Sequence, residues 1–137
     1  MGVYNFFKNR TMKSKEITIC GKKVMLAYCY ATEMAFYGYT EKDFTTFINE
    51  SYKQQNISPN YVMYAIISAI FAYYEANEEE SPIVDNDLMF HATPEEIKAA
   101  FIAVTQLYRE WYNLPAGEQE KSTEDDPKRK RRKGKNS

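Results

Sequence analysis

The chain has 137 residues, of which 15% are aromatic, a net charge of −1 at pH 7, and only two cysteines. This length and composition allow one domain with a sizeable core and exclude a disulfide-rich secreted scaffold. The most apolar window, residues 61–74, is shorter than the roughly 18 residues that span a bilayer, which excludes a membrane-spanning protein and favours a soluble, cytoplasmic one.

Charge and composition divide the chain into three parts. Residues 1–115 carry 10 basic and 14 acidic side chains (net −4), residues 116–127 carry a net −4, and residues 128–137 carry a net +7. We interpret residues 1–14 as a basic leader, residues 15–115 as a single domain, and residues 116–137 as a disordered, acidic-then-basic tail. The last segment lacks large apolar side chains and cannot offset the entropy of ordering.

Residues 16–28 predict a β-hairpin. Two short runs of strand-forming residues flank residues 21–22, and a two-residue loop with glycine first is typical of a type II′ turn. This register pairs Ile19 with Val24 and Ile17 with Leu26, so that the four side chains share one apolar face. Because a lone hairpin is only marginally stable in water, helices are expected to cover that face.

Four helical segments are predicted after the hairpin. A short helix covers residues 31–37 and ends at Gly38, and a second begins at Thr40 with acidic residues in its first turn. A third begins at Ser58-Pro59, and its residues 61–76 are apolar almost all round, which is typical of a central helix. Its core positions are predicted to be Ile66, Ile67, Ile70 and Phe71.

The fourth helix has the best start signal in the chain. Thr93 and Glu96 form a capping-box pattern around Pro94, whereas residues 82–92 before it are predicted to be a loop with at most one helical turn. Apolar residues then recur at alternating spacings of four and three: Ile97, Phe101, Val104, Tyr108 and Trp111. The predicted fold class is therefore mainly α (α+β), an N-terminal β-hairpin packed on about four helices.

The hairpin motif Ile19-x-Gly21-Lys22-x-x-x-Leu26-x-Tyr28, followed by a helix with Glu33 and then only helices, resembles tail assembly chaperones of long-tailed (siphovirus-type) bacteriophages and prophages. The resemblance implies a small protein of the bacterial host cytoplasm that binds the tape-measure protein, keeps it soluble and helps to recruit tail-tube protein. It also implies absence from the finished virion. The basic end departs from the family, and no functional residue of the family can be carried over by position.

Aromatic side chains crowd the two long predicted helices. Most are expected to lie half-buried in the core with their hydroxyls at its rim, but tyrosine and tryptophan are also preferred where another chain docks. The candidate partner-binding residues are Tyr61, Tyr64, Tyr73, Tyr74, Tyr108, Trp111 and Tyr112. Self-association through them is left open.

No catalytic, metal-binding or cofactor-binding motif is found in the sequence. His91 is the single histidine, and its spacing from Asp85 and Asp87 matches no zinc or calcium loop. Neither Cys20 nor Cys29 lies in a nucleophile motif, and no glycine-rich phosphate loop is present. The sequence therefore predicts a non-enzymatic protein without metal or cofactor.

The basic end provides an alternative function, a small accessory or regulatory protein that contacts nucleic acid through its tail. The candidate residues are Lys128, Arg129, Lys130, Arg131, Arg132 and Lys133. The acidic body argues against a dedicated nucleic-acid surface, and a solubilising tail explains the same residues. A third hypothesis, a structural tail component kept in the virion, is not separated from the chaperone by the sequence.

Overall fold

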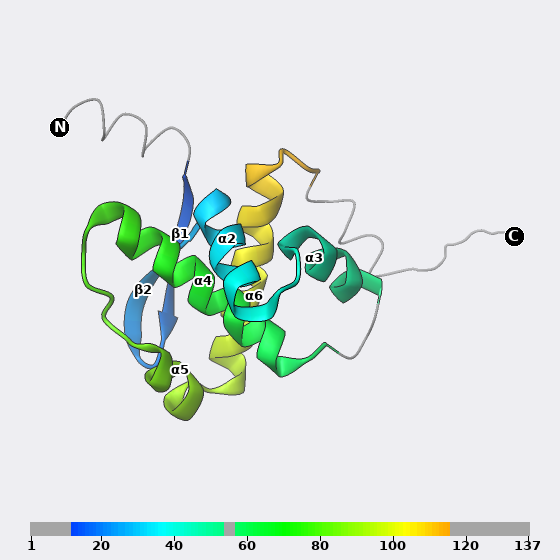
Figure 1. The fold of residues 1–137 in the computed structure, drawn as a ribbon. Helices are drawn as coiled ribbons and strands as arrows, with labels where there is room; N and C mark the ends of the chain where they lie inside the picture. Colours follow the sequence, from blue (N-terminus) through cyan, green and yellow to red (C-terminus); the bar gives the residue numbers. More distant parts are fainter. Residues whose placement is uncertain (1–11, 54–56, 116–137) are drawn as a thin grey trace, which may run out of the picture.

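The structure, a computed structural model, describes residues 12–53 and 57–115. In chain order its elements are β1 (Lys13–Ile19), β2 (Lys22–Tyr28), α2 (Tyr30–Thr40), α3 (Phe44–Lys53), α4 (Pro59–Asn77), α5 (Asp85–His91) and α6 (Pro94–Trp111) (Figure 1). The predicted α+β class, an amino-terminal hairpin followed by helices, is confirmed. Residues 13–14, predicted to be part of a leader, belong to β1, and the predicted tail at 116–137 lies outside the described residues.

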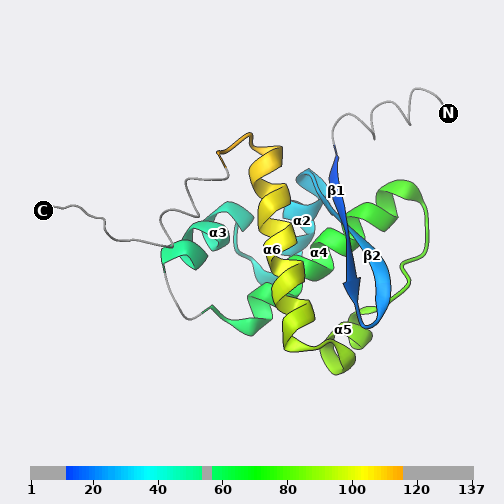
Figure 2. The same cartoon turned by 180° about the vertical axis from the view of Figure 1, so that it is seen from behind.

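Helix α4 lies at the centre of the molecule. In Figure 1 α2 lies in front of it, and in the view from behind α6 and the hairpin lie in front of it (Figure 2). It packs against α2, β2 and α6, while α6 also packs against β1. A helix covered on several sides must be apolar almost all round, which explains the composition of residues 61–76.

The hairpin turns one residue earlier than predicted. Its loop is Cys20-Gly21, where both residues have positive φ (53° and 72°), as a type I′ turn requires. The strands pair Ile17 with Val24 and Ile19 with Lys22, so the predicted loop and pairs are wrong. The predicted apolar face survives, because a two-position change in pairing leaves alternate side chains on the same side.

A contact from α6 stabilises the turn in its observed position. The side-chain carboxylate of Glu96 accepts hydrogen bonds from the backbone N–H of Cys20 (3.0 Å) and of Gly21 (3.4 Å). These donors face outward from the loop and would otherwise need water. The register is therefore stabilised by a residue that lies far along the chain.

Helix α2 runs past Gly38, which was predicted to end it. Gly38 keeps a helical backbone, and the helix ends at Thr40. Its C-cap is Glu41, whose φ is 59° and whose N–H donates to the Tyr37 carbonyl (2.7 Å). The hydroxyl of Thr40 donates to the carbonyl of Phe36 (2.8 Å), so Thr40 closes α2. The prediction that Thr40 opens the next helix is wrong, because α3 begins at Phe44.

The core prediction for α4 holds at three of four positions. Ile66, Ile67 and Ile70 are buried, with at most 8% of each side chain exposed. Phe71 is 45% exposed and the prediction for it is wrong. Its side of α4 faces neither the hairpin nor α6, but a hollow beside α2.

The segment at 82–92, predicted to be a loop, contains the short helix α5. The Asp87 carboxylate accepts a hydrogen bond from the N–H of Val84 (3.0 Å) at its start, and Leu88 anchors it in the core at 2% exposure. In α6 the predicted capping box is confirmed: the Thr93 hydroxyl accepts from the Glu96 N–H (3.1 Å), and the Glu96 carboxylate accepts from the Thr93 N–H (3.0 Å). The predicted apolar seam of α6 packs on the core.

Candidate functional site

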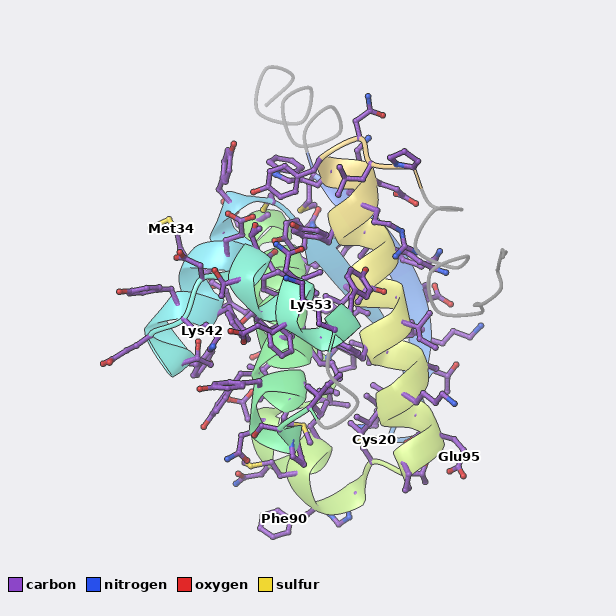
Figure 3. The ribbon with its side chains drawn as sticks, turned by 90° about the vertical axis from the view of Figure 1, so that its right-hand side faces the viewer. Cys20, Met34, Lys42, Lys53, Phe90 and Glu95 are labelled. Atoms are coloured by element: carbon purple, nitrogen blue, oxygen red, sulfur yellow. The ribbon has the colours of Figure 1, made fainter. Side chains whose placement is uncertain are left out.

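Helix α2 exposes an apolar face to solvent. Its core-facing side is covered through Thr32 and Phe36, which are fully buried. On the outward side Tyr30, Met34 and Tyr37 are 62%, 74% and 53% exposed, at spacings of four and three that place them along one face. Figure 3 shows Met34 pointing away from the body of the molecule. We call these three residues the outer face of α2.

An apolar groove begins beside this face. It has a volume of about 560 Å³ and runs between the second half of α4, the residues that follow it and the start of α5. A smaller hollow of about 270 Å³, lined by Ala35, Gly38, Tyr39 and Phe71, continues it along α2. Both hollows are lined by Tyr39 and Phe71 and therefore lie side by side, and we call the two together the apolar groove.

The groove is lined by both apolar and acidic side chains. The apolar lining residues are Ile67, Ile70 and Ile83, which are buried, and Phe71 and Val84, which are 45% and 62% exposed. The acidic side chains at the edge are Glu75, Glu79 and Asp85, all exposed. Burial first, and then the negative charge of Asp85, raise the pKa of the Tyr39 hydroxyl, which agrees with Asp85 facing Tyr39 across the groove.

The four candidate aromatic residues of α4 do not form one patch. Tyr61 and Tyr64 lie near its start, where Tyr64 stacks on Tyr39 with ring centroids 4.8 Å apart. Tyr73 and Tyr74 lie near its end, and the Tyr74 hydroxyl accepts a hydrogen bond from the backbone N–H of Met25 (3.0 Å). All four are partly buried, and Tyr74 also lines the groove. Tyr74 therefore binds the outer edge of β2 in addition to any role toward a partner.

The three candidates of α6 join an aromatic cluster around Tyr28. Tyr108 is buried at 5% exposure, and Trp111 is partly buried with its ring 5.2 Å from that of Tyr30. Tyr112 is 37% exposed, and its hydroxyl, like that of Tyr28, donates to the Glu33 carboxylate. Burial of Tyr108 leaves Tyr112 and the edge of Trp111 as the accessible members. The partner role of all seven candidates stays a prediction.

The sequence did not identify the exposed apolar residues of α2, nor the exposure of Phe71. Tyr30, Met34, Tyr37 and Phe71 were not among the candidates, although residues 30–40 carry a single charged side chain, Glu33. A short helix that is apolar all round must either be buried or dock against something. That signal was present in the sequence, but only the structure shows which side the core leaves open. The basic candidates at 128–133 lie outside the described residues.

The surroundings of the Cys20 thiol suit a structural role and not a catalytic one. Its Sγ donates to the carbonyl of Asp87 (3.3 Å), and its pKa is raised by burial first and then by the charges of Glu96 and Asp87. A raised pKa disfavours the thiolate that nucleophilic catalysis needs. Among the described residues, no group of three or more His, Cys, Asp and Glu side chains lies close enough together to hold a metal ion.

Comparisons with protein-family models, with curated proteins and with solved structures find no match for this chain. None of the described helices has the length and apolar character needed to cross a membrane. The fold and the surface together define an α+β protein, a hairpin on a helical body, that exposes an apolar helix face and a groove. Such a surface is typical of protein-binding sites.

Proposed function

We propose that this chain is a tail assembly chaperone that binds the tape-measure protein through the outer face of α2. The observation that carries the proposal is the exposure of Tyr30, Met34 and Tyr37 along one side of a helix whose other side is buried. The resemblance of the hairpin and first helix to that family supplies the identity of the partner. The proposed protein acts by binding, not as an enzyme.

Burial of apolar surface drives the proposed binding. Removing apolar area from water stabilises a complex by about 25 cal/mol per Å², and large exposed apolar patches on soluble proteins commonly mark docking sites. An amphipathic helix presents its own apolar side chains at spacings of three and four, which match those of Tyr30, Met34 and Tyr37. Covering such helices in a long partner keeps that partner soluble until it assembles.

Tail-tube protein and a second copy of this chain are further partners in the proposal, and its proposed location is the host cytoplasm. The alternative, nucleic-acid contact through residues 128–133, concerns residues outside the described part of the chain. Acidic residues outnumber basic ones in residues 1–115, which favours protein binding over nucleic-acid binding for the body.

Co-expression tests the proposal. The chain is expressed together with a tape-measure protein of a long-tailed bacteriophage, and the soluble yield of that partner is measured. We expect the intact chain to raise the yield, and Met34→Glu with Tyr37→Glu to remove most of the gain, because buried unpaired carboxylates oppose docking. Both positions are exposed, so circular dichroism should show an unchanged fold.

The matched control is Ala99→Glu with Ile102→Glu, which also adds two carboxylates at exposed positions, here on α6. It should leave the yield of the partner unchanged. No gain in soluble partner with the intact chain would contradict the chaperone proposal. Nucleic-acid binding with a steep salt dependence, lost on deletion of residues 128–137, would favour the alternative.

A further inference from the structure

Gly38 lines the apolar groove on the α2 side, and its backbone conformation does not require a glycine. It has helical dihedrals, and a Cβ built on it would meet no atom within 4 Å. Glycine inside a helix costs about 0.5–1 kcal/mol relative to alanine. Neither the backbone nor close packing requires this glycine, and its effect is to leave the hollow between Ala35 and Phe71 open. An open hollow over Phe71 suits a ligand side chain.

The edge of the groove is negatively charged on both sides. Glu75 and Glu79 lie on the α4 side, Asp85 lies at the start of α5, and among residues 12–53 and 57–115 no basic side chain lines either hollow. The basic residue in contact with the neighbouring loop is Lys22, and the Pro82 carbonyl accepts a hydrogen bond from its Nζ (3.2 Å). A partner with lysine or arginine beside its apolar side chains is therefore complementary to this surface.

A helix fits this groove better than an extended strand does. An added strand needs an unpaired sheet edge to satisfy its backbone, but the groove is lined by side chains of helices and of the loop before α5. At β2 the outward N–H of Met25 already donates to the hydroxyl of Tyr74. A helix satisfies its backbone internally, so it can bind through side chains alone.

We propose that the apolar groove binds an amphipathic helix of a partner protein in which lysine and arginine flank the apolar stripe. Apolar side chains of that helix cover Phe71 and Val84 and enter the hollow at Gly38. Its basic side chains face Glu75, Glu79 and Asp85. This inference rests on the proposed function and deepens it, because it names the chemistry of the segment that is bound beside the outer face of α2.

Two synthetic peptides test the chemistry of the occupant on the intact chain. The basic probe has about 14 residues, about 21 Å when helical, with leucine at spacings of three and four and lysine beside each leucine. The acidic probe replaces every lysine with glutamate. By fluorescence anisotropy we expect the basic probe to bind at least about tenfold more tightly at low salt, with the preference shrinking as salt rises. Equal affinities for the two probes would overturn the proposal.

Three variants locate the binding. Gly38→Leu fills the hollow from an open position and should weaken the basic probe about tenfold. Glu75→Lys with Glu79→Lys should remove or reverse the preference for the basic probe. The matched control, Glu95→Lys with Glu110→Lys, makes the same charge change at exposed positions of α6, on the other side of α4 (Figures 1 and 2). An equal effect of the control would show attraction by net charge alone and would overturn the proposal.

Other occupants have distinct signatures. Binding of the basic probe only after deletion of residues 1–11 or 128–137 would identify that basic segment of the chain itself as the occupant. Self-association that Gly38→Leu abolishes would identify a second copy. Either result would overturn the proposal. If the chain raises the soluble yield of the tape-measure protein but binds both probes equally, this inference alone is contradicted. If it binds the basic probe more tightly but does not raise that yield, the proposed function alone is contradicted.

Discussion

The side-chain carboxylate of Glu96 accepts a hydrogen bond from the backbone N–H of Cys20 (3.0 Å), and it thereby joins the first turn of α6 to the loop of the hairpin. The same carboxylate closes the capping box with Thr93. These backbone hydrogen bonds lower the pKa of Glu96, that from Thr93 first and that from Cys20 second. The Glu96 side chain thus stabilises both the first turn of α6 and the register of the hairpin strands.

Glu96→Gln should lower the melting temperature at neutral pH, and the loss should depend on pH. A carboxylate whose pKa is lowered in the folded state contributes stability above its unfolded pKa, about 4.5, and loses it as the pH falls through the folded pKa. The difference between wild type and variant should therefore be full above about pH 5 and shrink in more acidic solution. Thermal unfolding between pH 2 and about 7, followed by circular dichroism, measures it.

Glu95→Gln is the matched control for this change. Glu95 lies in the same first turn and shares the favourable helix dipole, but it is exposed at the adjacent position. Its replacement should cost less than that of Glu96. Equal losses for both variants would mean that the helix dipole, and not the contact with the hairpin loop, explains the effect.

Gly38→Ala should stabilise the fold by about 0.5–1 kcal/mol. The backbone at Gly38 is already helical, and the added methyl group would meet no atom within 4 Å. Urea unfolding with an unchanged m-value measures the gain. A loss of stability would show that Gly38 has a conformational role. Gly21→Ala provides the contrast, because φ at Gly21 is 72° and the substitution should destabilise the hairpin loop.

Ile66→Ala and Phe71→Ala should differ sharply although both residues lie on α4. Ile66 is fully buried, so its truncation removes buried methyl groups, leaves a cavity and should cost about 2–5 kcal/mol. Phe71 is 45% exposed, and its truncation should cost about 1 kcal/mol. Denaturant unfolding compares the two. A cost for Phe71 similar to that for Ile66 would show that the apolar groove is closed in solution.

Tyr28→Phe should destabilise the fold at neutral pH by about 1.5 kcal/mol, because the buried hydroxyl donates to the Glu33 carboxylate (2.8 Å). Burial first, and then the charge of Glu33, raise the pKa of Tyr28 far above its ordinary value of 10.0. A raised folded-state pKa gives stability that is full below pH 10 and is lost at higher pH, as the unfolded state ionises. The difference between wild type and variant should therefore shrink above about pH 10.

Tyr37→Phe serves as the control for alkaline unfolding, because Tyr37 is 53% exposed on the outer face of α2. Its replacement should leave the stability within about 0.5 kcal/mol of wild type, as is usual at the surface. If Tyr28→Phe had no greater effect than this control, the hydrogen bond to Glu33 would not stabilise the fold.

Local patterns in the sequence were sufficient to predict several elements of the fold. Thr93, Pro94 and Glu96 predict the start of α6 because a capping box satisfies backbone donors within one turn, without help from other segments. The spacing of apolar residues predicts the buried seam of α6 and the central place of α4, since the period of a helix alone decides which side chains share a face. The apolar face of the hairpin follows from alternation in the same way.

Local patterns in the sequence did not predict the other features of the fold, which depend on the tertiary structure. The hairpin loop at Cys20-Gly21 is stabilised by Glu96, far along the chain, which accepts hydrogen bonds from it. Helix α2 passes through Gly38 because glycine permits a helical backbone as readily as a cap, and the sequence does not select between them. Phe71 is exposed because α4 has more apolar sides than its neighbours cover. Which side stays open depends on where α2, α5 and α6 pack, and for that reason only the tertiary structure located the outer face of α2 and the apolar groove.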